Sequence, residues 1–369
     1  RVKMEKIGAF DNAWTWFDVT YYHPVTFSSK FEDLASIQAE RFLALDFPER
    51  IYRTEAGAVL GEYRRNASNP GMRMDEVLSD LAYGSAHGYG HTTMGYLDDV
   101  KTMPETYKAG VAFYDTYYRP NNAVVIVAGD VEVDATFALI ERTHGAWKPK
   151  EIPKQPGPAP VAGPKRGHVD WDSPVAPQIA YAFRVPACRP GTKEAAIIAV
   201  ASELISGRTS PLFKKLRYEK ESVTAMSTSR MSAEGFDERM LETTVRVNKE
   251  RYDKEGKALL DAIEADLAEG FEELAAFSKR EGAEKLLASI RSKYRYDLLA
   301  ELSSPHEISG VFSWYYRFDR DPKVLDKIVE AVGSLTPADV DAFAAKYFLP
   351  ERRVVVTMTQ KATQSGEEK

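Results

Sequence analysis

The pattern of apolar and polar residues predicts a chain in which helices alternate with short strands. Residues 178–185 place Ile179, Tyr181, Phe183 and Val185 on one side, which is the period of a half-buried strand. The other predicted elements in the first half are a strand at 14–22, helices at 29–44, 48–66, 74–83 and 104–117, a strand at 123–128 and a helix at 134–143. In the second half they are helices at 193–206, 211–221, 254–269, 271–302 and 304–318, one or two polar strands within 222–247, and a strand at 352–357.

The last helix has the clearest start signal. Thr336 can cap it, Pro337 fits its first position, and Asp339 places a negative charge three residues after the cap. Both halves of the sequence end in a helix, an aromatic residue, a proline and a short β-branched strand. This recurrence indicates an internal duplication, so we expect an α+β protein of two similar domains, each a mostly antiparallel sheet packed with helices.

A proline-rich segment marks the expected domain boundary. Between Trp147 and Gly167 the sequence carries six prolines and three glycines, a composition that favours an extended, semi-rigid spacer. We therefore predict an N-terminal domain at 1–147, a linker at 148–167 and a C-terminal domain at 168–369.

Composition excludes several classes of function. The 49 basic and 55 acidic residues give a net charge of −6 and are interspersed, which is not the pattern of a nucleic-acid-binding protein. The longest apolar runs are far shorter than the roughly 18 residues that a membrane span requires. A single cysteine, Cys188, excludes an internal disulfide and a cysteine-rich zinc site. We expect it to be a small packed side chain.

Two glutamates are the first candidates for chemistry. Glu55 and Glu62 are seven residues apart in the predicted helix at 48–66, so about two turns separate them and their carboxylates share one face. By themselves they would be interpreted as part of an ordinary solvated helix face.

The histidines supply no H-x-x-E-H motif. The six are His23, His87, His91, His144, His168 and His306. His87 and His91 have the spacing of two zinc ligands on one helix face, but Gly88 and Gly90 lie beside them and favour a loop.

The segments around the two glutamates resemble the pitrilysin/insulinase family of inverted-zincin metallopeptidases. They are D-N-A-W-T-W-F-D-V-T-Y-Y at 11–22, Y-G-H-T-T-M-G at 89–95 and F-Y-D-T-Y-Y-R-P-N-N-A-V-V-I-V-A-G-D at 113–130. The resemblance implies that Glu62 binds Zn²⁺, that Glu55 braces the site from behind, and that an H-x-x-E-H helix shortly before Asn12 supplies the remaining ligands and the catalytic base. The sequence at hand begins after that position, so we expect it to lack a segment of the natural protein and to be inactive by itself.

The same resemblance implies how peptides are held. Asn12 and Ala13 would lie on the strand that pairs with the substrate backbone, and Arg217 would grip the substrate, with a tyrosine expected seven residues later. Position 224 is a threonine instead. The resemblance therefore implies a partner subunit of the same family that supplies an arginine/tyrosine pair, in a homo- or heterodimer whose chains enclose a peptide-sized chamber, each chain being half of a clam shell.

Two functions follow from the sequence. The first is a zinc metalloendopeptidase subunit of the catalytic type that hydrolyses peptides, with its histidine helix outside this sequence. The second is a non-catalytic structural or peptide-clamping subunit of the same family. The sequence leaves the compartment open, because the resemblance is compatible with a bacterial periplasm or cytoplasm.

Overall fold

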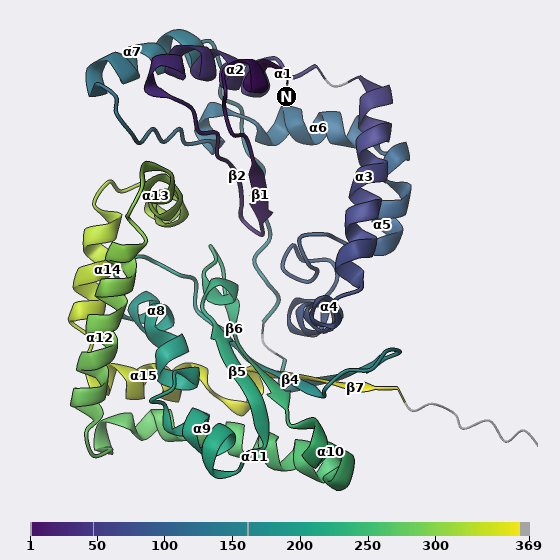
Figure 1. The fold of residues 1–369 in the computed structure, drawn as a ribbon, viewed down its shortest axis with the longest axis vertical. Helices are drawn as coiled ribbons and strands as arrows, with labels where there is room; N and C mark the ends of the chain where they lie inside the picture. The colour runs from purple at the N-terminus through teal and green to yellow at the C-terminus, as the bar shows by residue number, and fades with distance from the viewer. Residues whose placement is uncertain (1, 47, 161, 362–369) are drawn as a thin grey trace, which may run out of the picture. The chain divides into compact units, whose positions relative to one another are not determined.

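The computed structural model describes residues 2–46, 48–160 and 162–361, which form two compact units (Figure 1). Unit 1 consists of residues 1–66, 93–156 and 298–320, and unit 2 of residues 67–92, 157–297 and 321–369. Each unit therefore draws on both halves of the sequence. The predicted domain boundaries at 147 and 168 stay a prediction.

Unit 1 is mainly helical. Its strands are β1 (Ala13–Trp16) and β2 (Val19–Tyr22), and its longer helices are α2 (Phe31–Leu43), α3 (Glu49–Ala67, which ends at the boundary with unit 2), α6 (Tyr107–Tyr117), α7 (Val133–His144) and α13 (Pro305–Asp319). Short helices complete it: α1 (Val2–Lys6), η1 (Ser28–Lys30), α5 (Leu97–Thr102), η2 (Met103–Glu105) and η3 (Pro120–Asn122). The predicted helices at 29–44, 48–66, 104–117 and 134–143 are confirmed to within a few residues.

The single strand predicted at 14–22 was wrong, because the chain reverses within it. β1 and β2 are antiparallel, with Trp16 opposite Val19, so Phe17 and Asp18 form a two-residue turn. The apolar residues on both sides of this turn hid the reversal from the sequence pattern.

Helices cover both faces of this hairpin. On one face, Tyr22 lies edge-on to Phe42 of α2, with ring centroids 5.3 Å apart. On the other face lies α13, a helix from the C-terminal half of the sequence, where Tyr21 Oη and Ser309 Oγ are 3.0 Å apart. The hairpin is thus held between helices that are far apart in the sequence.

The strand predicted at 123–128 was also wrong. This segment is extended but pairs with no strand in the described part of the chain, and Val124 and Val125 are 44% and 51% exposed. A β-branched run becomes a strand only where a neighbouring strand supplies hydrogen bonds.

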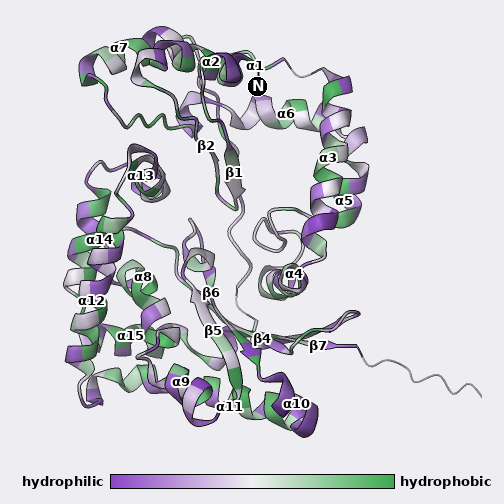
Figure 2. Cartoon of the chain, in the orientation of Figure 1, coloured by the Kyte–Doolittle hydropathy of each residue, from purple (hydrophilic) through white to green (hydrophobic). Residues whose placement is uncertain are grey.

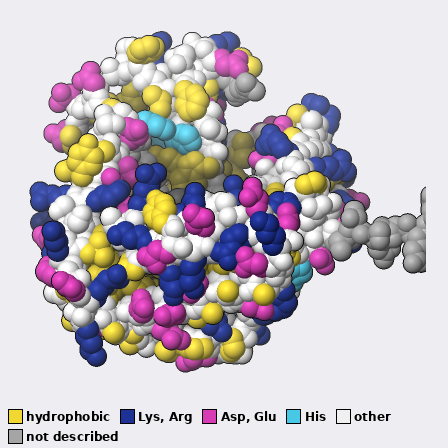
Figure 3. Space-filling model, turned by 60° about the horizontal axis from the view of Figure 1, so that its bottom comes forward, with side chains coloured by type: hydrophobic (Ala, Val, Ile, Leu, Met, Phe, Trp, Pro, Cys, Tyr) yellow, Lys and Arg dark blue, Asp and Glu magenta, His cyan; other side chains and the backbone are white. Residues whose placement is uncertain are grey.

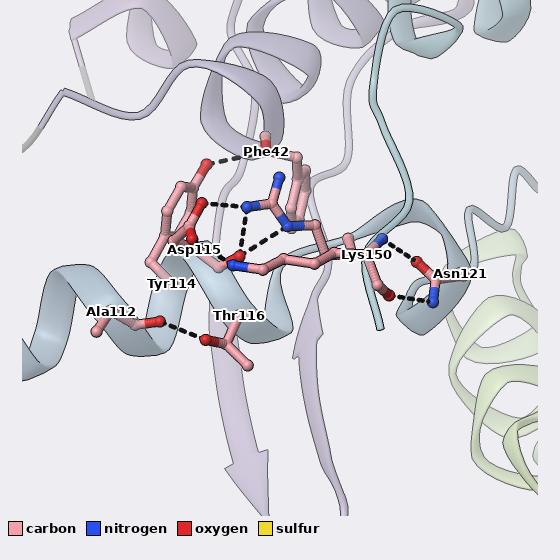
Figure 4. Close-up of polar contacts among 8 residues, drawn as sticks. Phe42, Ala112, Tyr114, Asp115, Thr116, Asn121 and Lys150 are labelled. Carbon is pink, nitrogen blue, oxygen red and sulfur yellow. Dashed lines mark hydrogen bonds and ion pairs between the residues drawn. The ribbon is translucent and has the colours of Figure 1, made fainter. Parts of the chain in front are cut away.

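The R-P-N-N motif before this segment anchors the start of the proline-rich stretch (Figure 4). Asn121 accepts from the Lys150 backbone N–H at 3.2 Å and donates to the Lys150 carbonyl at 2.8 Å. The Lys150 Nζ donates to Asp115 of α6 at 2.6 Å. The stretch therefore begins as an extended segment fixed to unit 1.

Unit 2 contains a five-stranded mixed sheet. Its order is β3-β7-β4-β6-β5, in which β3 and β7 are parallel and the other three pairs are antiparallel. The strands are β3 (Lys165–Trp171), β4 (Gln178–Val185), β5 (Val223–Ser229), β6 (Arg239–Val247) and β7 (Arg353–Gln360).

The helices of unit 2 pack against this sheet or against one another. They are α4 (Pro70–Tyr83), α8 (Lys193–Ser206), α9 (Pro211–Lys214), the π-helical η4 (Lys215–Glu219), α10 (Lys249–Glu255), α11 (Lys257–Glu273), α12 (Ala283–Ala300), α14 (Val324–Gly333) and α15 (Pro337–Tyr347), with the short η5 (Met231–Ala233), η6 (Leu274–Lys279) and η7 (Pro350–Arg352). Figure 2 shows α8 as mostly hydrophobic and α10 as mostly hydrophilic, as expected because α8 is buried along most of its length and α10 has no buried residue.

Several predictions in unit 2 are confirmed. The strand at 178–185 and the helix at 193–206 have the predicted bounds, and Thr336 and Asp339 form a complete capping box at the start of α15. The aromatic residues Tyr181 and Phe271, each 1% exposed, stack in the core with centroids 5.5 Å apart. The sequence analysis missed α14, and it missed β3, whose first residues lie in the predicted linker.

The chain is therefore an α+β protein built around a mixed five-stranded sheet. Within the described residues unit 1 has only a two-stranded sheet, so the expected likeness of two sheet-bearing domains stays a prediction. No helix in the described ranges is both long and apolar enough to cross a membrane.

Candidate functional site

Glu55 and Glu62 lie on the solvent-exposed side of α3. The helix packs on α6 through Tyr52, whose hydroxyl lies 2.9 Å from Thr106 Oγ1 and whose ring occupies the space that a side chain at Gly110 would need. Ala56 and Tyr63 are its two buried residues, and they point to a different side from the two glutamates. Both carboxylates are thus presented to solvent on one face, as the spacing predicted.

A separate flank of α3, about 100° or more around the helix from these carboxylates, carries two glycines. A Cβ atom built at Gly57 or Gly61 would meet no heavy atom within 4 Å in the described structure, and neither glycine has a positive φ. Glycine inside a helix costs about 1 kcal/mol relative to alanine, and here no backbone conformation requires it. The flank leaves room for the close approach of another element.

The described residues do not by themselves fit a zinc ion. Glu62 is 51% exposed and its nearest cation is Arg65, whose Nη2 lies 3.7 Å from Oε1. No group of three histidine, cysteine, aspartate or glutamate side chains that could hold a metal occurs within the described ranges. A structural or catalytic zinc site needs at least three protein ligands, so one carboxylate is insufficient.

The hairpin offers an open strand edge at the predicted peptide-binding residues. The His23 backbone N–H donates to the Asn12 carbonyl at 2.9 Å, and hydrogen-bonded pairs alternate along an antiparallel ladder. Ala13 and Thr15 therefore direct their backbone groups to the outer edge of β1, which pairs with no other strand in the described part of the chain. The Ala13 N–H is capped by Asn12 Oδ1 at 2.9 Å.

Arg217 lies in unit 2, on the π-helical turn η4. Its guanidinium forms no ion pair within the described residues, and the Tyr218 ring centroid is 6.0 Å from its Cζ. Tyr218 is itself 57% exposed. π-Helical turns are rare and occur often at functional sites, so an unpaired cation beside an exposed aromatic ring is available to a ligand.

A buried carboxylate fixes this turn to α11. Asp266, 5% exposed, accepts from Lys220 Nζ at 2.7 and 2.8 Å and from Lys215 Nζ at 2.9 Å. The two lysines flank Arg217 in sequence, so the ion pairs hold both ends of the segment that carries it.

Threonine stands where the resemblance implied a tyrosine. Thr224 lies at a β-bulge of β5, and its Oγ1 donates to the Arg246 carbonyl at 3.3 Å. The hydroxyl is thus used within the sheet.

The structure places the predicted residues in two groups. Asn12, Ala13, Glu55 and Glu62 belong to unit 1, and Arg217 belongs to unit 2. Within unit 1, Asn12 forms hydrogen bonds within its own hairpin and Glu62 lies near Arg65 of its own helix. Their roles stay predictions.

Two pairs of titratable residues were missed by the sequence analysis. Burial, then Glu242 and Glu76, raise the pKa of Asp75 to about 7, and burial raises the pKa of Glu242. In unit 1, the rings of His23 and His306 lie 5.1 Å apart. Both pairs join residues far apart in sequence, so no local spacing could have indicated them.

Comparison with known proteins gives a consistent result. The family described as Peptidase M16 inactive domain matches residues 106–275. The chain is 26% identical over 330 residues to the zinc protease PqqE of Helicobacter pylori, an alignment that covers 85% of this chain and 68% of that protein.

Solved structures share the fold. A protease from Helicobacter pylori superposes with a TM-score of 0.82 at 23% identity, covering 96% of this chain and 83% of the other. A peptidase M16 inactive domain from Pseudomonas fluorescens superposes with a TM-score of 0.78 at 17% identity, covering 99% of this chain and 84% of the other.

Proposed function

Because this chain belongs to the M16 family of peptidases, the pitrilysin and insulinase family, we propose that it is part of a zinc metalloendopeptidase that hydrolyses peptides. The observation that carries this proposal is the open face of α3, where Glu55 and Glu62 project together into solvent. In the complete site Glu62 would bind the metal and Glu55 would orient a ligand.

The remaining ligands would come from outside the described residues, from further sequence of the same protein or from a partner chain. The helix surface supports this arrangement. Besides the glycine flank of α3, the neighbouring helix α6 has no buried residue, and Val111 and Phe113 are 39% and 57% exposed. Apolar side chains in such numbers on one helix are usually covered by another element.

Peptide recognition would use the free edge of β1. An extended peptide can add to that edge through the backbone groups of Ala13 and Thr15, which gives affinity with little dependence on sequence. The Asn12 side chain would have to release the Ala13 N–H first. Arg217, unpaired in unit 2, would bind a carbonyl or carboxylate oxygen of the substrate, and a partner subunit would supply the tyrosine that position 224 lacks.

The second candidate is a non-catalytic, peptide-clamping subunit. The description of the matching family as an inactive domain favours it. It would use the same strand edge and Arg217 without hydrolysis.

The deciding experiment measures zinc content and cleavage of a quenched fluorescent peptide by the full-length gene product. Glu62→Gln is the test variant, and Glu49→Gln on the same helix, which removes only an exposed ion pair with Arg53, is its control. Stoichiometric zinc and turnover that are lost only in Glu62→Gln support the peptidase. A metal-free, inactive wild type that still binds the peptide, and stays inactive after addition of a family partner subunit, supports the clamp.

A further inference from the structure

Helix α13 docks on the hairpin through ring contacts, a hydrogen bond and an ion pair. Besides the Tyr21–Ser309 hydrogen bond, the rings of Trp14 and Trp314 lie 5.9 Å apart. At the first turn of α13, the docking contact is the His306 ring against that of His23.

The environment of His23 suits only a neutral ring. Both ring nitrogens are shielded from solvent, and neither has a hydrogen-bond partner in the described structure. The ring stacks on Tyr21, with centroids 5.3 Å apart and planes 13° from parallel, and the centroid of the Phe10 ring lies 6.2 Å from that of His23. A protonated His23 ring would have two buried N–H donors without acceptors, whereas the neutral ring has one. Protonation therefore raises the free energy of the docked state.

The carboxylates near the two rings in the described structure already have other partners, although Asp11 partly favours the charged form of His23. Asp11 accepts from both terminal nitrogens of Arg41, at 3.2 and 2.6 Å. Glu307, next along α13, accepts from two serine hydroxyls at the helix start. Asp18, at the hairpin turn, faces Arg317 at 3.8 Å. A positive charge at the first turn of α13 is also opposed by the helix dipole.

We propose that the contact of His23 with His306 is an acid-sensitive release for α13: the helix stays docked on the hairpin while the His23 ring is neutral, and protonation of His23 undocks it. Undocking exposes the His23 ring to solvent, so the free energy of its protonation is recovered only in the undocked state. The proposal concerns the fold of unit 1 and does not depend on the proposed peptidase function.

The direction of the pH dependence follows from the burial of His23. Burial, and then His306, lower the pKa of His23 from its ordinary 6.5, while Asp11 opposes them. Docking is therefore fully present above about pH 6.5 and weakens as the pH falls below it, by up to about tenfold per pH unit for each proton taken up. The pH dependence expected from the Asp75–Glu242 pair of unit 2 has the opposite sign, because acid relieves the repulsion between its carboxylates.

Undocking would free the strand that carries Asn12 and Ala13. One face of the hairpin would lose its contacts with α13, and α13 would no longer hold the edge of β1 in a fixed position. Binding of an extended peptide to that edge should then weaken in acid, without any change in the residues that contact the peptide.

Hydrogen exchange measured by mass spectrometry tests the proposal on the 369-residue chain. After correction for the intrinsic effect of pH, exchange in peptides covering 305–319 and 19–25 should rise about tenfold or more between pH 7.5 and pH 5.5. Exchange in α8 of unit 2 should stay constant. Equal loss of protection in α8 would mean general acid unfolding and would overturn the proposal, as would constant protection in α13.

Three variants assign the effect to the pair. His306→Gln changes an exposed residue and should make the pH dependence shallower, because it removes the ring that helps to lower the pKa of His23. His23→Phe keeps the aromatic packing and should keep α13 protected at pH 5.5. His168→Gln, a histidine of unit 2, is the control and should behave like wild type. An unchanged transition in both His306→Gln and His23→Phe would refute the assignment.

Discussion

Replacement of Asp266 by asparagine should loosen the segment that carries Arg217. Asp266 is buried in α11 and accepts from Lys215 and Lys220, which lie at the two ends of that segment. Asparagine keeps the shape of the side chain and removes its charge. The two lysines then lose their shared counter-ion, while Lys215 keeps its bond to Glu269 at 2.7 Å.

The expected loss of unfolding free energy depends on how far Lys215 and Lys220 are exposed to solvent. Removal of one member of a buried ion pair usually destabilises by about 3–5 kcal/mol, because the remaining charge stays buried. Here Lys215 and Lys220 are 29% and 48% exposed, so water can solvate them after the change. We therefore expect a loss of about 2–3 kcal/mol in the free energy of unfolding of unit 2. For a domain of about 150–250 residues this is a fall in Tm of about 4–12 °C.

Urea unfolding followed by circular dichroism at about pH 7.5 measures the loss, and hydrogen exchange over residues 211–222 locates it. The matched control is Asp261→Asn on the same helix, which breaks an exposed pair with Lys257 (79% and 54% exposed) and should cost less than about 0.5 kcal/mol.

Lys215 sets the pH dependence of the difference in unfolding free energy between wild type and Asp266→Asn. Its hydrogen bonds to Glu269 and Asp266 raise its pKa above the ordinary 10.5, so its contribution is fully present below pH 10.5 and is lost only as the pH rises through the higher value of the folded state. The difference between wild type and Asp266→Asn should thus be flat through neutral pH. If Asp266→Asn were no less stable than Asp261→Asn, the reasoning would be refuted.

Three further changes test other features of unit 2. Asp75→Asn should stabilise the protein above about pH 7 and have no effect near pH 4, because the raised pKa of Asp75 imposes a penalty that appears as the pH rises from 3.8 to about 7. Since solvent reaches this side chain, we expect a gain of about 1–2 kcal/mol in the free energy of unfolding, measured in urea across pH, and an effect independent of pH would contradict the role of Glu242. Glu221→Gly should stabilise by about 0.5–1 kcal/mol in thermal melts, because Glu221 has φ of 48°, and destabilisation would show that its side chain matters more than its backbone. Thr336→Ala should cost about 1 kcal/mol by removing the cap of α15, with an unchanged melting curve as the contrary result.

Local signals in the sequence were sufficient for many elements of the fold. The alternation of residues 178–185 predicted β4, and Thr336 with Asp339 predicted the start of α15. These features depend on interactions within one strand or one helical turn, so they can be read without knowledge of the partner. The common face of Glu55 and Glu62 follows in the same way from the helical repeat alone.

Pairing between distant segments was decided only by the tertiary structure. The same kind of β-branched sequence is a strand at 353–360, where β3 and β4 flank it, and is unpaired at 123–128, where no strand lies beside it. The start of β3 looked like linker because its partner, β7, is almost 190 residues away along the chain, as the pairing of Lys165 with Val354 shows.

What the sequence determined by itself is the family resemblance, the helix that presents Glu55 and Glu62, and the open question of the missing zinc ligands. What only the tertiary structure decided is which faces those elements leave free and which distant groups meet, such as His23 with His306. The physical reason is that helix and turn preferences act over a few residues, whereas burial, strand pairing and the charge state of a histidine depend on whatever the fold brings within a few ångströms.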